Sequence, residues 1–188
     1  MLKNLKDYVV KLENFLDKDF CEQTINQLKI IDWKQHEFYN PITKALINRS
    51  GSNELEVSQE NILNKGIIMD KLHGAIKEYI NRFNFPWFTS WKGYSSIRFN
   101  RYTEDKRMAL HCDHISSVFD GKKRGIPILS CLGTLNNDYS GGEFVILEDE
   151  IIELKKGELL IFPSNFLYPH RVKPVNKGIR YSYISWVY

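Results

Sequence analysis

The sequence predicts an α+β protein, mainly β, in which an N-terminal helical region supports a sandwich or barrel of short antiparallel strands. Up to about residue 85 the apolar residues recur with a helical period, whereas beyond residue 87 they alternate with a period of two. Turn residues divide the second half into short segments, and no alternation of strands with helices favours a parallel sheet. At 188 residues we expect a single domain over residues 1–188, with helical support in residues 1–90 and the β core in residues 91–188.

The N-terminal elements are predicted from helix caps and apolar periodicity. Residues 8–12 have the pattern of a short strand. Asp17 or Asp19 can cap a helix that follows, because either carboxylate can accept a backbone N–H of the first turn. A second amphipathic helix is predicted from about residue 58 to residue 83, and the sequence Asn84-Phe85-Pro86 ends it.

The second half is predicted to consist of eight strands separated by Asn-, Asp- and Gly-containing turns. The predicted strands cover residues 95–102, 109–113, 126–136, 142–147, 150–154, 158–162, 169–173 and 180–187. Strands of this length and spacing are typical of an antiparallel sandwich or barrel.

Composition and charge are those of an ordinary globular protein. Lys plus Arg is 26 and Asp plus Glu is 23, and the net charge of +3 argues against a protein that coats nucleic acid. Three widely spaced cysteines predict neither a disulfide framework nor a zinc site. The first fifteen residues show no continuous apolar run, and no segment is long enough to span a bilayer. We therefore expect a reduced, cytoplasmic protein without membrane contact; the sequence does not indicate its oligomeric state.

Three residues of the second half form a pattern suited to a metal. In the sequence His111-Cys112-Asp113, positions i and i+2 of a strand point to the same face, so an imidazole and a carboxylate would project together. His170 lies on a later predicted strand. Two imidazoles and one carboxylate are the ligands of a facial triad, which binds non-haem Fe(II) and leaves coordination positions open.

An arginine lies downstream of this pattern. Arg180 begins the last predicted strand, and Ser182 lies on the same face. A guanidinium with a neighbouring hydroxyl can bind a carboxylate through two hydrogen bonds. The sequence therefore combines a candidate metal site with a candidate site for an anionic co-substrate.

These motifs resemble the catalytic domain of 2-oxoglutarate- and Fe(II)-dependent oxygenases, and most closely the prolyl 4-hydroxylase-like branch in its short bacterial and phage form. The resemblance covers residues 95–188. Its matching segments are Arg101-Tyr102, His111-Cys112-Asp113, Thr134-Leu135-Asn136 with residues 139–144, residues 156–164, and residues 170–175 with 178–182. The resemblance implies a double-stranded β-helix (jelly roll) core braced by N-terminal helices.

The resemblance also implies a role for each site residue. His111, Asp113 and His170 would be the iron ligands and the catalytic triad. Arg180 would bind the distal carboxylate of 2-oxoglutarate, where many prolyl 4-hydroxylases have lysine. Tyr102 would donate a hydrogen bond to the same co-substrate, with Ser182 as a further contact. Met108 replaces a tyrosine that in some members offers a second hydrogen bond to the co-substrate.

The implied reaction is hydroxylation of an unactivated C–H bond, with O2 consumed and succinate and CO2 released, and with ascorbate as an accessory reductant. Because the carboxylate ligand Asp113 is present, we expect hydroxylation rather than halogenation.

The branch favours a prolyl residue in a peptide or protein as the substrate. A free amino acid or small molecule remains an alternative, as does a non-catalytic jelly-roll binding module. Nucleic-acid demethylation is disfavoured, because residues 180–185 lack the extra arginine and asparagine of that branch. In a phage-encoded protein the location would be the host cytoplasm.

A polar segment, residues 114–125, separates two predicted strands. A loop of this length is often a lid over an active site. Its basic residues 122–124 would then attract an anionic substrate, although a solvated basic turn explains them equally well. We interpret His36 and His73 as surface or helix-packing histidines, since neither belongs to a metal-binding pattern.

Overall fold

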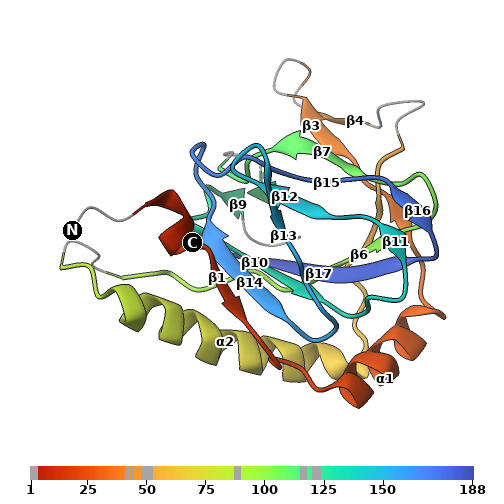
Figure 1. Cartoon of the computed structure of the whole chain (residues 1–188), viewed down its shortest axis with the longest axis horizontal. Coiled ribbons are helices and arrows are strands. Elements are labelled where there is room, and N and C mark those ends of the chain that lie inside the picture. The colour runs from red at the N-terminus through yellow and green to blue at the C-terminus, as the bar shows by residue number, and fades with distance from the viewer. Residues whose placement is uncertain are drawn as a thin grey trace.

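A large antiparallel sheet forms one wall of the protein in a computed structural model (Figure 1). The structure describes residues 4–40, 43, 45–47, 53–86, 90–114, 118–119 and 124–188. In spatial order the sheet consists of β1 (Val10–Leu12), β14 (Leu159–Pro163), β10 (Leu129–Thr134), β17 (Arg180–Val187), β6 (Arg98–Tyr102), β5 (Glu56–Ser58) and β2 (Lys34–Gln35).

A smaller antiparallel sheet faces the large one (Figure 1). Its order is β13 (Glu150–Ile152), β12 (Phe144–Ile146), β15 (His170–Val172) and β7 (Met108–His111). The described residues also form three two-stranded pairs: β11 (Ser140–Gly141) with β16 (Val175–Lys177), β3 (Phe38–Asn40) with β4 (Ala45–Ile47), and β8 (Val118–Phe119) with β9 (Arg124–Gly125). Two facing antiparallel sheets make the predicted jelly roll, and each of the eight strands predicted in the second half overlaps an observed one.

Two helices lie against the outer face of the large sheet, after a short 3-10 turn (Leu5–Tyr8) (Figure 1). The first, α1 (Lys18–Leu28), is capped by Asp17, whose Oδ1 accepts the N–H of Phe20 at 2.7 Å. The second, α2 (Leu63–Phe83), ends at Asn84, which is in the left-handed conformation with φ 42°. Among the described residues no helix is long and apolar enough to cross a membrane.

The central strands of the large sheet are buried on both faces, which divides the core into two layers. Successive residues of each strand point alternately into the layer on the helix side and into the layer between the sheets. Cys131 and Tyr183 lie in the helix-side layer, whereas their neighbours Leu132 and Ile184 lie between the sheets. All eight residues of β17 are buried for this reason. Phe99 of β6 belongs to the helix-side layer and Tyr102 to the inner layer. The strand parity therefore determines which polar side chains point between the sheets.

The N-terminal region contributes strands as well as helices. Strands β5 and β2 extend the large sheet beyond β6, and β1 pairs with β14 at its other edge. The predicted start of the second helix at residue 58 is wrong, because Ser58 pairs with Phe99 as part of β5. Most residues of the proposed lid, including 120–123, lie outside the described residues.

Gly133 in β10 is covered by the ring of Tyr183 in the neighbouring strand. A Cβ added at Gly133 would lie 2.0 Å from Cζ of Tyr183, whose side chain is 1% exposed and therefore cannot swing into solvent. We expect Gly133→Ala to lower the free energy of unfolding by about 1–3 kcal/mol, measured by chemical denaturation. Gly74→Ala in α2 is the control, because a Cβ added at Gly74 meets nothing within 4 Å. This substitution should raise the free energy of unfolding by about 0.5–1 kcal/mol. Equal stabilities of the two variants would contradict this packing argument.

Candidate functional site

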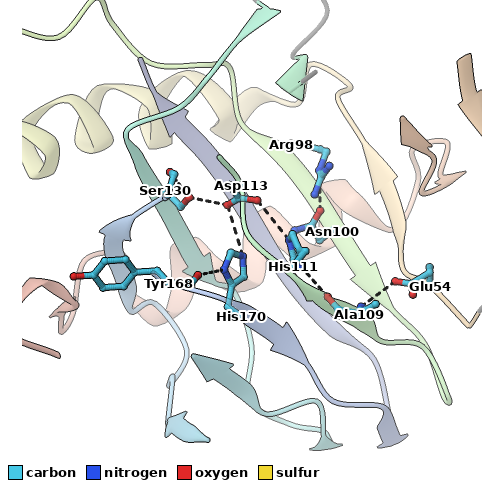
Figure 2. Close-up of polar contacts among 10 residues, drawn as sticks. Glu54, Arg98, Asn100, Ala109, His111, Asp113, Ser130, Tyr168 and His170 are labelled. Carbon is cyan, nitrogen blue, oxygen red and sulfur yellow. Dashed lines mark hydrogen bonds and ion pairs between the residues drawn. The ribbon is translucent and has the colours of Figure 1, made fainter. Parts of the chain in front are cut away.

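Two histidines are brought together by the pairing of strands in the small sheet. His111 is the last residue of β7, His170 is the first residue of β15, and the two are direct partners in the register (Figure 2). Their ring centroids are 4.3 Å apart. The strand predicted to reach residue 113 ends at His111, so Asp113 lies in the bend that follows. The bend nevertheless directs the Asp113 carboxylate at both imidazoles.

The three side chains form a compact cluster. Nε2 of His111 lies 3.4 Å from Oδ1 of Asp113, and Nε2 of His170 lies 3.6 Å from Oδ2. One candidate ligand atom from each residue lies within 4.8 Å of the other two. His170 and Asp113 are buried, and His111 is partly exposed. Among the residues that the structure describes, this is the one group of three or more His, Cys, Asp or Glu side chains arranged in this way.

Backbone carbonyls fix the orientation of both imidazoles (Figure 2). Nδ1 of His111 lies 2.8 Å from the carbonyl oxygen of Ala109, and Nδ1 of His170 lies 3.1 Å from that of Tyr168. A carbonyl only accepts, so Nδ1 carries the proton in each neutral ring. The lone pair of each Nε2 then faces the Asp113 carboxylate. Converging lone pairs repel unless a cation lies between them, which is the donor arrangement of a metal site.

Two serines hold the carboxylate. Ser130 of β10 donates a hydrogen bond of 2.6 Å to Oδ2 of Asp113, and its Oγ is 2.7 Å from Oγ of Ser164. All three residues are buried. The large sheet therefore positions a ligand that follows a strand of the small sheet.

Ser130→Ala should lower the affinity for Mn(II), a stand-in for Fe(II), by about 10–100-fold, because outer-shell partners orient metal ligands. Calorimetric titration of the metal-free protein measures this. Ser185→Ala, also a buried serine of the large sheet but hydrogen-bonded to Ser95, should leave the affinity unchanged. Equal metal affinity in both variants would show that Ser130 does not position Asp113.

The electrostatics favour the ligand forms of two of the three groups. Burial lowers the pKa of His170 to about 4, so its imidazole is neutral near pH 7. Burial alone would raise the pKa of Asp113, but His170, His111 and the Ser130 hydroxyl outweigh burial and hold the pKa below its usual range. For His111, burial is outweighed by the Asp113 carboxylate, which raises the pKa. A metal ion would compete with that proton for Nε2 of His111.

A buried arginine lies on the inner face of the large sheet. Arg180 is 1% exposed, donates from Nη1 to Oγ of Ser182 at 2.9 Å, and lies over the Tyr102 ring at 4.9 Å. Its Nε has no hydrogen-bond partner, and among the described residues no carboxylate forms an ion pair with it. Thr134, which pairs with Ser182 in the register, likewise has a buried hydroxyl without a partner. A buried guanidinium without an acidic partner among the described residues, beside the unpartnered hydroxyl of Thr134, fits an anionic ligand.

Comparison with known proteins gives the family. Residues 97–188 match the model of the 2OG-Fe(II) oxygenase superfamily. A PKHD-type hydroxylase of Aliarcobacter butzleri is 37% identical over 178 residues, which cover 89% of this chain and 71% of that protein. The chain belongs to the 2OG-Fe(II) oxygenase superfamily. A PKHD-type hydroxylase of Idiomarina loihiensis is 37% identical over 100 residues, covering 51% of this chain and only 43% of the relative. The match thus spans less than half the length of that relative.

Solved structures with the same fold confirm the predicted architecture of this chain. A viral collagen prolyl hydroxylase from Paramecium bursaria chlorella virus 1, in complex with 2OG, gives a TM-score of 0.64 at 17% identity and covers 96% of this chain and 94% of that one. A Trichoplax adhaerens prolyl hydroxylase, in complex with a hypoxia-inducible factor peptide fragment, gives a TM-score of 0.69 at 18% identity. The match covers 96% of this chain and 83% of that one. At these identities the likeness shows the double-stranded β-helix fold.

The structure places further polar side chains near the triad that the sequence interpretation missed. Arg98 and Asn100 share the inner face of β6 with Tyr102, Figure 2 shows the two joined by a hydrogen bond, and the charge of Arg98 acts on His111. His36 is 8% exposed, and the charges of Arg98 and His111 act on it. The interpretation of His36 as a surface or helix-packing residue is therefore wrong. The period-two pattern of residues 98–102 was a usable signal for Arg98 and Asn100, whereas no local pattern marks His36.

Proposed function

We propose that this protein is an Fe(II)- and 2-oxoglutarate-dependent dioxygenase that hydroxylates an unactivated C–H bond, with a prolyl residue of a peptide or protein as the substrate and succinate and CO2 as co-products. One observation carries the proposal. The chain presents, between the same two sheets, a His-Asp-His cluster and a buried arginine that lacks an acidic partner among the described residues. The first suits a divalent iron, and the second suits a dicarboxylate co-substrate.

In this proposal His111, Asp113 and His170 hold Fe(II), and Arg180 binds the distal carboxylate of 2-oxoglutarate with help from Ser182 and Tyr102. Iron and 2-oxoglutarate, when bound, supply the oxygen chemistry that converts a C–H bond to C–OH. The donor set fits because it offers two neutral nitrogens and one carboxylate, which leaves coordination positions free for co-substrate and O2.

The surrounding residues would orient and shield the reaction. Ser130 and the two backbone carbonyls keep the ligands aimed at one point. The rings of Phe144 and Phe162 lie 5.6 and 5.0 Å from that of His170, so its inner side is apolar and excludes water. The carboxylate ligand would occupy a position that a halide needs, which favours hydroxylation.

Relatives support the prolyl substrate. The structural neighbours described above include a collagen prolyl hydroxylase and a prolyl hydroxylase in complex with a peptide. The curated relatives are named PKHD-type hydroxylases. These likenesses place a prolyl residue first among the substrates to be tried, ahead of free amino acids and other small molecules.

Succinate release tests the reaction. The purified protein is incubated with Fe(II), 2-oxoglutarate and ascorbate, with and without proline-containing peptides, and succinate and products 16 Da heavier are measured by mass spectrometry. We expect succinate and a hydroxylated peptide in equal amounts. Absence of both with every peptide and in cell lysate would contradict the oxygenase proposal and favour a non-catalytic binding module. Succinate with a heavier small molecule instead of a peptide would contradict the prolyl substrate alone.

A further inference from the structure

A second arginine points between the two sheets, away from Arg180. Phe99 of β6 packs on the helix side, so its neighbours Arg98 and Asn100 face inward with Tyr102. The Arg98 guanidinium lies over the ring of Trp186, a member of the inner layer, at 5.1 Å. Figure 2 shows Arg98 joined to Asn100, and the charge of Arg98 acts on His111 and is acted on by Asp113. Arg98 is therefore part of the wall of the site.

Arg98 is held in place but is not neutralised. Its Nε donates to Oδ1 of Asn100 at 3.1 Å, which fixes the plane of the guanidinium. None of the ion pairs between described residues includes Arg98, and none of their hydrogen bonds uses its two outer nitrogens. Burial lowers its pKa, although the nearby Tyr102 and the Asp113 carboxylate act in the opposite direction. The free edge of the guanidinium is the edge that binds a carboxylate through two hydrogen bonds.

Arg98 and Arg180 lie too far apart to share one small dianion. In the register of β6 with β17, Arg180 is opposite Tyr102 and Arg98 is opposite Ile184. Four residues along a strand separate the Cα positions by about 13 Å. The two guanidinium groups also lie over different rings, that of Trp186 for Arg98 and that of Tyr102 for Arg180. A five-carbon dicarboxylate spans only about half of this distance. A co-substrate bound to Arg180 therefore leaves Arg98 free for another molecule.

The neighbouring histidine does not compete for this role. Burial and the nearby charge of Arg98 lower the pKa of His36 to about 3, so His36 is neutral near pH 7. Its buried Nδ1 has no hydrogen-bond partner among the described contacts. This side of the site thus offers one permanent positive charge, from Arg98, with the neutral polar groups of Asn100 and His36 around it. The one carboxylate that acts on Arg98 and His36, that of Asp113, is already directed at the two imidazoles of the cluster.

We propose that Arg98 binds a carboxylate of the substrate, so that the enzyme selects substrates that carry an acid group. This inference rests on the proposed oxygenase function and narrows its substrate class. The carboxylate is either the α-carboxylate of a free amino acid or the side chain of an acidic residue next to the target proline in a peptide. The chemistry at Arg98 is the same for both.

Pairs of acids and their amides test the proposal without turnover. The protein is loaded with Mn(II) and 2-oxoglutarate under anaerobic conditions and titrated in a calorimeter. One pair is L-proline and L-prolinamide, and the other is acetyl-prolyl-aspartyl amide and acetyl-prolyl-asparaginyl amide. We expect the acid of one pair to bind roughly 30-fold tighter than its amide, because Arg98 is partly buried and removing one partner of a desolvated charge pair costs about this factor. The pair that discriminates identifies the source of the carboxylate.

Variants assign this preference to Arg98. Arg98→Met keeps an apolar stem on Trp186 and should bind acid and amide equally, and Arg98→Lys should retain part of the preference. The control is Arg101→Met, because Arg101 lies on the same strand but faces the other way and pairs with Glu56 at 2.8 Å. It should keep the full preference. The affinities for Mn(II) and 2-oxoglutarate, measured first, show that each variant is folded.

The outcomes separate the two proposals. A protein that binds neither Mn(II) nor 2-oxoglutarate overturns the oxygenase function. A protein that binds both, but binds no acid more tightly than its amide, overturns the role of Arg98 alone. An acid preference that survives in Arg98→Met also overturns it.

Discussion

Asp113→Ala is expected to reduce the affinity for Mn(II) or Fe(II) by more than about 100-fold, beyond the loss caused by an outer-shell change such as Ser130→Ala. Asp113 is the one anionic member of the cluster, and its two oxygens face both imidazoles at 3.4 and 3.6 Å. Its removal takes away a ligand and the charge that balances the cation. Calorimetric titration of Mn(II) into the metal-free protein measures the affinity.

Two further variants make this result specific. Asp113→Asn preserves volume, so loss of metal binding with an unchanged thermal unfolding midpoint would exclude misfolding as the cause. His114→Ala removes an exposed histidine one residue away and should leave the metal affinity unchanged. Should Asp113→Ala and His114→Ala bind Mn(II) equally well, the metal would have to lie elsewhere.

The sequence predicted the triad because its positions depend on local features. His111 and Asp113 are two residues apart, so they stay close whether the chain continues as a strand or bends, as it does after β7. His170 begins a strand that the sequence also predicted. The bend itself was not predicted, because the sequence does not show that the pairing of β7 with β15 stops at His111.

The N-terminal contribution to the site was beyond the reach of periodicity. His36 follows β2, which has two residues, and β2 reaches the site by pairing with β5, which in turn pairs with β6. Strands of two or three residues are too short to show alternation. Their placement depends on contacts between segments far apart in the sequence, which one chain without its fold does not reveal.

Arg98 illustrates a different limit. Its position on the inner face follows from strand parity, which the sequence shows. Its significance depends on the absence of an acidic partner among the described residues and on its distance from Arg180, and both require the three-dimensional structure. The sequence thus reveals which residues share a face, whereas the fold reveals which charges are balanced.

Arg180→Met is expected to lower the affinity for 2-oxoglutarate by about 30-fold or more, because it removes one partner of a buried charge pair. Calorimetry on the Mn(II)-loaded protein measures it. Arg180→Lys should lose less, since lysine keeps the charge but not the planar pair of donors. If Arg180→Met and the unchanged protein bind 2-oxoglutarate equally, the distal carboxylate is bound elsewhere.

The stability of Arg180→Met should differ from that of most buried substitutions. Without ligand Arg180 is 1% exposed, and among the described residues its guanidinium has one hydrogen bond, to Ser182, and no acidic partner, so it bears the cost of burial without a compensating anion. Replacing such a charge by an apolar side chain of similar length is often neutral or stabilising. We therefore expect the ligand-free variant to unfold at the same temperature as the unchanged protein or higher.

Addition of 2-oxoglutarate at 100 times its Kd should stabilise the unchanged Mn(II) form by about 2.7 kcal/mol, and at the same concentration it should stabilise the variant far less. A variant that is destabilised without ligand and stabilised fully with it would show that Arg180 supports the fold and not the co-substrate.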